Sequence, residues 1–321
     1  MFENPLVTVL IPVYNRPSVV KTIDSIIHQT YSNLEILIID NASTDDTVEV
    51  IRNINDKRIR LVINETNLGQ TGSMNKGLKL ASGKYIARID SDDIALPERI
   101  EEQVRFMEEH PDYVLVGAWI QYISDDDQLG GVMRMCTTDK GLRFMQTFFC
   151  GIHHPTAMYR TDVIRENSIE YEPGISMAED YEMWRKLLHF GKGLNIGKVL
   201  VYYRRGENND SLKHYDQMVK ESLLVRKRVC AELELNTRDR EKLDKALALL
   251  DIRNKSLSQI IYYFRTMFGL FHRKISKSDQ DYGILRRYVF QMSFGTCFFE
   301  NQRFYAKVLN FAYKQLRKTM H

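Results

Sequence analysis

Three carboxylates stand close together in the segment Asp90-Ser-Asp-Asp93, directly after the apolar run Tyr85–Ile89. The run predicts a buried strand, and such a strand in an open α/β sheet meets ligands only at its carboxyl edge. Asp90 and Asp92 could together face a hard divalent cation that also grips phosphate oxygens. A solvated acidic turn is the alternative for this segment taken alone. A calcium loop fits less well, because apolar residues stand where that loop needs a ligand and a glycine.

The elements that must position these acids alternate between strand and helix. The expected strands are Leu6–Pro12, Leu34–Ile39, Ile59–Ile63, Tyr85–Ile89 and Tyr113–Tyr122, with helices ending near Gln29, Ile54, Ala81 and His110. Alternation with short connections predicts an α/β fold with a mostly parallel, Rossmann-like sheet. After residue 122, Asp125–Asp127 and Gly130-Gly131 indicate a turn and a small antiparallel part. We interpret the three aspartates as a solvated loop without chemistry.

Length and charge indicate two parts, a catalytic domain over 1–220 and a helical, basic and aromatic extension over 221–321. Hydrophobic residues make up 44% and charged residues 27% of the 321, which is typical of a soluble globular protein. From Asn236 to His321 there are 17 Lys and Arg against 7 Asp and Glu, whereas the remainder carries 28 against 35. This asymmetry favours an acidic body and a basic tail that meets something anionic.

The sequence favours a protein of the reducing cytosol that does not cross a membrane. The four cysteines are far apart, with no paired spacing for a metal or a disulfide framework. No signal peptide pattern and no apolar run of about 20 residues is present. Asn301–Lys318 predicts a helix with an aromatic face opposite a basic one. Such a helix either lies in an anionic membrane interface or packs on its neighbours, as a dimerisation module would.

Further polar segments follow the other expected strands in a fixed order. They are Pro12-Val-Tyr-Asn15, Asp40-Asn-Ala-Ser-Thr-Asp45, Asn67-Leu-Gly69, Asn75-Lys-Gly77, Ala81-Ser-Gly83-Lys-Tyr85 and the acidic cluster itself. From about Pro5 to Ser211 the chain resembles the inverting family-two glycosyltransferases of the GT-A fold. The resemblance implies a nucleotide-diphosphate sugar donor, with UDP favoured, and Mn²⁺ or Mg²⁺. It also implies a saccharide or lipid-linked acceptor for surface polysaccharide, and a peripheral position on the cytoplasmic face of the plasma membrane.

The resemblance assigns donor contacts to the first three strand ends. Pro12, Tyr14 and Asn15 would line the nucleobase pocket, and Asn67 and Gly69 would lie against the nucleoside. Asp40 would accept a hydrogen bond from a ring N–H of the base, since a carboxylate is an acceptor only. The alternatives are a packing role for Tyr14 and a loop or capping role for Asp40.

The resemblance also assigns the metal and the catalytic base. Asp92 would bind the cation directly, Asp90 would bind it through water or contact the ribose, and Asp93 would orient the sugar or begin the next helix. Asp180, in Glu179-Asp180-Tyr-Glu-Met-Trp184, would remove the proton of the acceptor hydroxyl. Glu179 would shape the acceptor site or the pKa of Asp180. The alternative for this acidic pair is stabilisation of a helix N-terminus.

Three more residues are carried over from motifs of the second half. His154, in His154-Pro155-Thr-Ala-Met-Tyr-Arg160, would lie near the sugar and acceptor, or be a structural hydrogen bonder. Arg204, after the last expected strand, would face phosphate or close a loop. His214 would reach the metal, although its spacing from Arg204 departs from the family's commoner pattern.

Two other classes of function compete with glycosyl transfer. A nucleotidyltransferase shares the α/β base and the metal-bound pyrophosphate, but it carries a glycine-rich basic loop where this chain has Pro12-Val-Tyr-Asn15. A membrane- or partner-docking module, including a homodimer, would describe the basic tail but leave the acidic strand ends unexplained. No nucleic-acid partner is expected, because no nucleic-acid-binding motif accompanies the basic charge.

Overall fold

The computed structural model describes residues 4–206, 213–249, 259, 262, 265–267, 269–270 and 274–287. The chain forms two compact units, Met1–Val229 and Cys230–His321. The expected boundary after residue 220 stays a prediction; helix α9 (Tyr215–Ala231) runs across it. The second unit contains α10 (Thr237–Ala248), which Asn236 caps by accepting the Asp239 N–H. Asn301–Lys318 lies outside the described residues.

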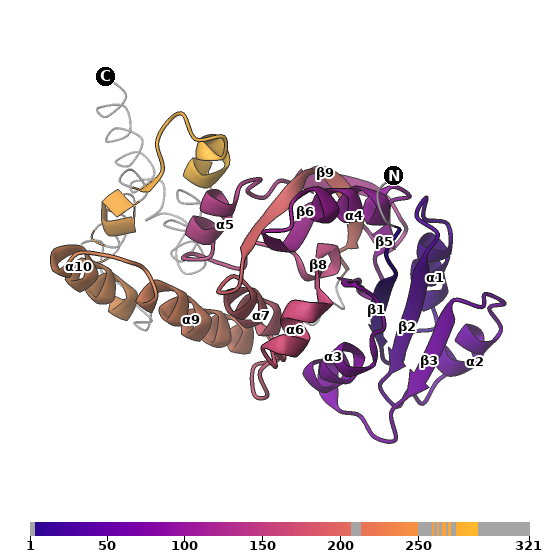
Figure 1. Ribbon diagram of the computed structural model, residues 1–321. Helices are drawn as coiled ribbons and strands as arrows, with labels where there is room; N and C mark the ends of the chain where they lie inside the picture. Colours follow the sequence, from indigo (N-terminus) through magenta and orange to yellow (C-terminus); the bar gives the residue numbers. More distant parts are fainter. Residues whose placement is uncertain are drawn as a thin grey trace. The chain divides into compact units, whose positions relative to one another are not determined.

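The described part of the first unit is built on one nine-stranded sheet (Figure 1). Its strands are β1 (Val7–Val13), β2 (Leu34–Asp40), β3 (Ile59–Ile63), β4 (Tyr85–Arg88), β5 (Ile94–Ala95), β6 (Tyr113–Ile123), β7 (Leu129–Met133), β8 (Met158–Arg160) and β9 (Lys192–Arg204). The spatial order is β3-β2-β1-β4-β8-β6-β9-β5, and β7 pairs with β6. The expected GT-A arrangement, a mostly parallel sheet with a small antiparallel part, is confirmed.

The first four strands run parallel and in register, which brings their carboxyl ends to one edge. Val13 pairs with Asp40, and Asp40 pairs with Ile63. The antiparallel strand β8 lies between β4 and β6, in the middle of the sheet rather than at its margin. Its position joins the parallel half to the half that carries β6 and β9.

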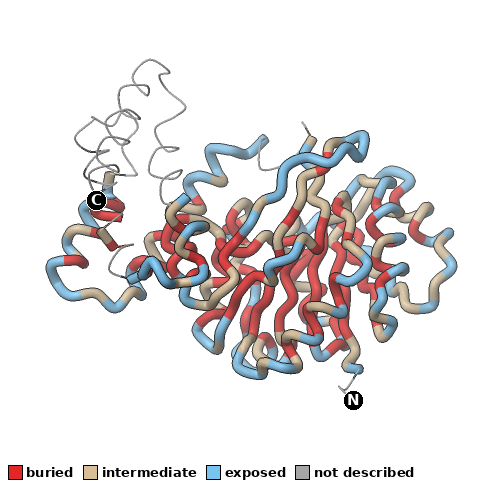
Figure 2. The backbone as a smooth tube through the Cα atoms, turned by 90° about the horizontal axis from the view of Figure 1, so that it is seen from above, coloured by how far each residue is buried: buried red, intermediate tan, exposed pale blue. Residues whose placement is uncertain are grey.

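Helices cover both faces of the sheet, as the alternation of strand and helix predicts. They are α1 (Val19–Ile27), α2 (Thr47–Arg52), α3 (Gly69–Leu80), α4 (Arg99–Glu109), α5 (Asp139–Met145), α6 (Thr161–Glu166) and α7 (Glu179–Leu187), with a 3-10 turn, η1 (His154–Thr156). Side chains of α1, α2 and α4 pack on one face, and those of α3, α5, α6 and α7 on the other. The buried strands between them form the red centre of Figure 2.

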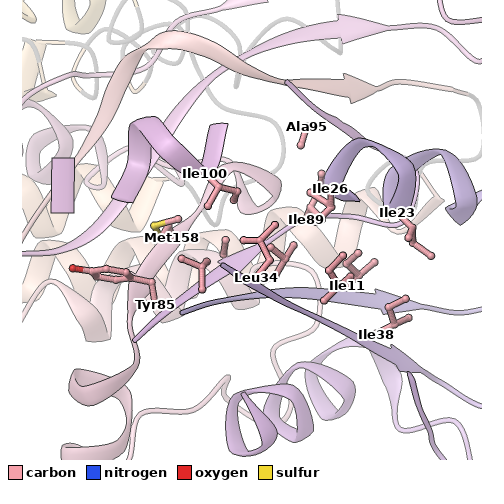
Figure 3. Packing of buried hydrophobic residues seen from close by; sticks show 14 of the residues in the cluster. Ile11, Ile23, Ile26, Leu34, Ile38, Tyr85, Ile89, Ala95, Ile100 and Met158 are labelled. Carbon is pink, nitrogen blue, oxygen red and sulfur yellow. The ribbon is translucent and has the colours of Figure 1, made fainter. Parts of the chain in front are cut away.

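Alternate residues of each central strand enter opposite cores, as the two-residue period of a strand requires. Ile11 and Ile38 join the core under α1 and α4 with Ile23 and Ile100 (Figure 3). Leu10 belongs to the opposite core. Strands buried on both faces expose functional groups only at their ends, and the site therefore lies at the shared carboxyl edge.

Candidate functional site

The loops after β1 and β2 bind each other and form one wall of the site. Asn15, with φ of 44°, donates its backbone N–H to Ser43 Oγ at 2.9 Å and accepts the Thr44 N–H at 2.8 Å. Tyr14 is 47% exposed beside this junction, and Pro12 is half-buried in β1. The turn therefore presents an aromatic ring to solvent on a backbone fixed by side-chain bonds.

Asp40 ends β2 with its side chain fully buried. One carboxylate oxygen, Oδ2, accepts the Ser43 N–H at 3.0 Å, and the other, Oδ1, has no hydrogen-bond partner among the described residues. A buried carboxylate oxygen without a donor is costly, so a ligand that donates a hydrogen bond would be stabilised there.

The loop after β3 is tied to the same edge by a network of amides. Asn41 Nδ2 donates to Asn67 Oδ1 at 2.7 Å, and Asn41 Oδ1 accepts from Leu68 N and from Asn64 Nδ2. Gly69 follows with φ of +69°, a left-handed conformation that glycine adopts without a side-chain clash. This turn starts α3 and leaves Asn67 at the surface of the site.

The acidic loop after β4 gathers three carboxylates in differing surroundings. Asp90 forms an ion pair with the fully buried Arg88, and Asp92 forms one with Arg16, at 3.1 Å between Nη1 and Oδ2. Burial and then the negative charge of Asp90 raise the pKa of Asp92. The same causes, with Asp92 added, raise the pKa of the buried Asp93 well above its usual value. Burial and mutual repulsion thus disfavour the charged forms of Asp92 and Asp93.

Arg204 closes this loop from the end of β9. Its backbone N–H donates to Asp93 Oδ1 at 2.7 Å, its Nε to the Asp92 carbonyl at 3.0 Å and its Nη1 to the Ser124 carbonyl at 2.6 Å. Its guanidinium also pairs with Asp127, which in turn pairs with Lys21 of α1. The guanidinium therefore anchors the acidic loop to the β6–β7 turn. Asp127, expected in a solvated loop, contributes to that anchor because the turn lies beside the end of β9.

The second acidic pair begins α7 and meets the residues after β8. Glu179 is 6% exposed; its Oε1 accepts Gln70 Nε2 at 3.0 Å and lies 3.8 Å from His154 Nδ1. His154 Nε2 lies 2.9 Å from Tyr171 Oη. Burial and then Asp180 raise the pKa of Glu179 well above its usual value. Glu179 therefore lies beside His154 and takes its hydrogen bond from Gln70 of α3.

Asp180 is half-buried at the start of the helix. Its Oδ1 accepts the Tyr181 N–H at 2.7 Å, and its Oδ2 lies 3.4 Å from Cys150 Sγ. Burial raises the pKa of Asp180, whereas the bonds from Cys150 and Tyr181 and the positive charge of Arg88 oppose the rise. Asp180 is therefore a stronger base than an ordinary aspartate and still accepts few hydrogen bonds.

The structure brings most of the expected residues to one edge and adds several that the sequence reasoning missed. Arg16, Arg88, Gln70 and Cys150 each contact an expected acid. An arginine inside the apolar run Tyr85–Ile89 was the available signal for Arg88, because such a residue is buried only when it is paired. His153 has a buried Nε2 without a partner among the described residues, and burial lowers its pKa to about 4. His214 lies exposed just before α9.

The acidic loop fits a divalent cation only if the ligand supplies further oxygens. Among the described residues, no group of three or more His, Cys, Asp or Glu side chains is arranged to hold a metal. Asp90 and Asp92 provide hard oxygen donors, which suit Mg²⁺ or Mn²⁺ that keeps waters and binds phosphate. The residues present therefore fit a cation shared with a diphosphate.

Comparison with known proteins now identifies the class to which this fold and site belong. The model of glycosyl transferase family 2 matches residues 8–168. The chain is 31% identical to the UDP-Glc:alpha-D-GlcNAc-diphosphoundecaprenol beta-1,3-glucosyltransferase WfaP of Escherichia coli, over 69% of this chain and 86% of that protein. The chain therefore belongs to glycosyl transferase family 2, and this membership favours glycosyl transfer over nucleotidyl transfer.

Solved structures confirm the fold at low sequence identity. TarS from S. aureus in complex with UDP-GlcNAc is 19% identical with a TM-score of 0.61, over 90% of this chain and 88% of that chain. Mannosyltransferase PcManGT from Pyrobaculum calidifontis, in complex with GDP-Man and Mn²⁺, is 15% identical with a TM-score of 0.58, over 92% and 88%. Structural neighbours of this fold thus include complexes with a nucleotide sugar and with a divalent metal.

Proposed function

We propose that the protein transfers a hexose from a UDP-sugar to a hydroxyl group of a saccharide or lipid-linked acceptor, with inversion at the anomeric carbon. The observation that carries the proposal is the meeting of two acidic groups, Asp90–Asp93 and Glu179-Asp180, at the carboxyl edge of the sheet. The negative charge of Asp90 contributes to the raised pKa of Asp180, so the two groups lie close enough to interact electrostatically. WfaP supports the UDP-sugar and the lipid-linked acceptor, because its name states both.

Asp180 acts in this proposal as the general base. It takes the proton of the acceptor hydroxyl while that oxygen bonds to the anomeric carbon, and the bond from this carbon to the diphosphate oxygen breaks. Attack from the side opposite the leaving group inverts the configuration. A raised pKa suits a base that must be ionised near neutral pH and still take a proton.

The diphosphate leaves from the side of the acidic loop. Asp92 would hold Mg²⁺ or Mn²⁺ there directly, and Asp90 would bind the cation through water or contact the ribose. The cation, when bound, would act as a Lewis acid on the departing diphosphate. Arg16 lies against Asp92 and could turn to the phosphates once that carboxylate is engaged. Asp40 binds the nucleobase of the donor, Tyr14 offers a ring on which that nucleobase stacks, and Arg204 keeps the acidic loop in place.

The basic tail is proposed to hold the enzyme on the anionic cytoplasmic leaflet, near a lipid-linked acceptor. No helix among the described residues is long and apolar enough to span a bilayer. The support for the proposal is the net charge after Asn236 and the composition of Asn301–Lys318. Each Lys or Arg near such a surface contributes about 1 kcal/mol, and salt screens the attraction.

Replacing Asp180 with Asn should lower the turnover of UDP release from UDP-glucose by roughly 10²–10⁴-fold, because the base is lost. UDP affinity, measured by calorimetry, should change less than about twofold. Asp162→Asn, an exposed aspartate of α6, is the matched control and should retain full turnover. In the wild type, turnover should rise with pH through the raised pKa of Asp180. Loss of UDP binding in parallel with turnover would instead assign Asp180 to the donor site.

Replacing Asp92 with Asn should lower turnover by on the order of 10³-fold or more, because the departing diphosphate loses its cation. EDTA should abolish transfer, and added Mn²⁺ or Mg²⁺ should restore it. Calorimetry of Mn²⁺ binding in the presence of UDP gives a second measurement that does not depend on turnover. Undiminished transfer in EDTA would contradict the proposed role of the metal.

Replacing Asp40 with Asn should shift the nucleotide preference of the donor site from UDP towards CDP. The unpartnered Oδ1 of Asp40 accepts the ring N–H of uracil, whereas an amide can donate to the ring nitrogen of cytosine. We expect UDP binding to weaken by about tenfold or more and CDP binding to strengthen relative to UDP. Titration of both nucleotides against wild type and variant measures this. Equal losses for UDP and CDP would show that Asp40 only supports the loop.

Neutralising the tail should weaken binding to anionic vesicles. Arg317→Gln with Lys318→Gln should reduce sedimentation with vesicles containing phosphatidylserine at low salt, while UDP binding stays unchanged. The control pair, Lys57→Gln with Lys79→Gln, removes equal charge from exposed positions of the first unit. The proposal fails if full-length wild type stays in the supernatant at low salt.

A further inference from the structure

The segment that carries Asp180 into the site has no regular secondary structure of its own. Residues 171–178 are irregular, with a turn at 173–174 and a bend at 177–178, and Gly174 has φ of +91°. No strand ladder or helix fixes such a segment, so its position depends on the side chains that bind its backbone. These side chains come from α3 on one flank and from α9 on the other.

Helix α3 binds the segment from the donor flank. Thr71 Oγ1 donates to the Ile175 carbonyl at 3.1 Å. Asn75 pairs with the backbone of Tyr171 twice, donating from Nδ2 at 2.9 Å and accepting at Oδ1 at 2.8 Å. The helix that begins at the Gly69 turn therefore holds the segment at Tyr171 and Ile175.

Helix α9 binds the second half, next to Asp180. Glu221 is 8% exposed, and its Oε2 accepts two successive backbone N–H groups, Ser176 at 2.9 Å and Met177 at 2.7 Å. Its other oxygen accepts Gln217 Nε2 at 2.7 Å, and the same nitrogen donates to Ser176 Oγ at 3.0 Å. The carboxylate thus fixes the backbone three and four residues before Asp180.

The same helix holds the segment by apolar contact and by charge. Val225 and Val229 pack with Ile175, Ala178 and Tyr181 in one buried cluster. Arg228 donates to Glu172 at 2.9 and 3.0 Å and pairs with Glu182 at 2.9 Å. Glu172 precedes Asp180 and Glu182 follows it, so Arg228 of α9 binds the chain on both sides of Asp180.

We infer that Glu221 is a positioning residue for Asp180, and that α9 is part of the catalytic apparatus although the family match ends at residue 168. The inference rests on the proposed role of Asp180 as base. Glu221 is an anionic acceptor for two partly buried N–H groups, and an amide in its place accepts more weakly. A base displaced by about 1 Å can cost on the order of 10²-fold in rate.

Glu221→Gln in the full-length chain tests this. We expect the turnover number per UDP-binding site to fall about 10- to 100-fold, with the KM for UDP-glucose changed less than about twofold. UDP release is measured with a GlcNAc-diphospholipid acceptor and with water alone, and binding sites are counted by UDP calorimetry. Asp216→Asn, an exposed acid of the same helix, is the matched control and should match wild type. A structural role alone would lower Tm and the number of binding sites but not the turnover number of each site.

Two further variants keep the outcomes distinct. If Glu221→Gln does not fold, Gln217→Leu removes the exposed donor that orients Glu221, and a reduced turnover number with unchanged donor KM is again expected. Asp180→Asn is measured alongside. Full transfer by Asp180→Asn would overturn the proposed function. Loss of transfer in Asp180→Asn together with wild-type turnover in Glu221→Gln or Gln217→Leu would overturn only the positioning role.

Discussion

The site depends on one ion pair, between the fully buried Arg88 and the partly exposed Asp90 of the acidic loop. Burial alone would lower the pKa of Arg88, but Asp90 more than offsets this and raises it. The arginine carries a permanent positive charge where four carboxyl groups have raised pKa values, namely Asp92, Asp93, Glu179 and Asp180. Its backbone is fixed by the Ala157 carbonyl and by Arg99 Nη2. The positive charge of the fixed Arg88 guanidinium offsets part of the repulsion between the acids of Asp90–Asp93 and those of Glu179-Asp180. The two acidic groups can therefore lie close together.

The sheet order explains how the two acidic groups meet. Parallel strands β1 to β4 bring Asp40 and Asp90 to one edge, because their connections return each strand to the same direction. The antiparallel strand β8 then pairs beside β4, and the turn η1 that precedes it supplies His154 to Glu179. The proposed base, ninety residues after Asp90, therefore reaches the side of the proposed donor site through strand pairing and not through proximity in the chain.

The sequence allowed the layout of the parallel half to be predicted, because apolar runs with polar ends report strands buried on both faces. The family resemblance supplied Asp180, which periodicity alone would have left as a helix-start acid. What could not be predicted depends on pairings between distant residues. Arg204 was expected to face phosphate or close a loop, but its partners in the acidic loop and at Asp127, 77 positions away, could not be read from the sequence. Ser18 precedes α1, at a position where serine commonly caps a helix, yet its side chain makes no capping bond. Local rules cannot choose among such partners.

The same distinction applies to where the catalytic unit ends. Sequence motifs mark residues that contact ligands. The backbone that carries a general base is held by other residues, which are recognised only by their contacts in the structure. Glu221 reads in sequence as one acid of an amphipathic helix, and its function appears only when the N–H groups of Ser176 and Met177 lie against it. Segment 171–178 has no strand pairing to fix its backbone. Side chains such as Glu221 fix it instead, whereas strand pairing fixes the backbone at Asp40 and before Asp90. The segment before Asp180, the proposed base, is thus held by side chains from outside the matched region, and α9 supplies the carboxylate that binds its backbone.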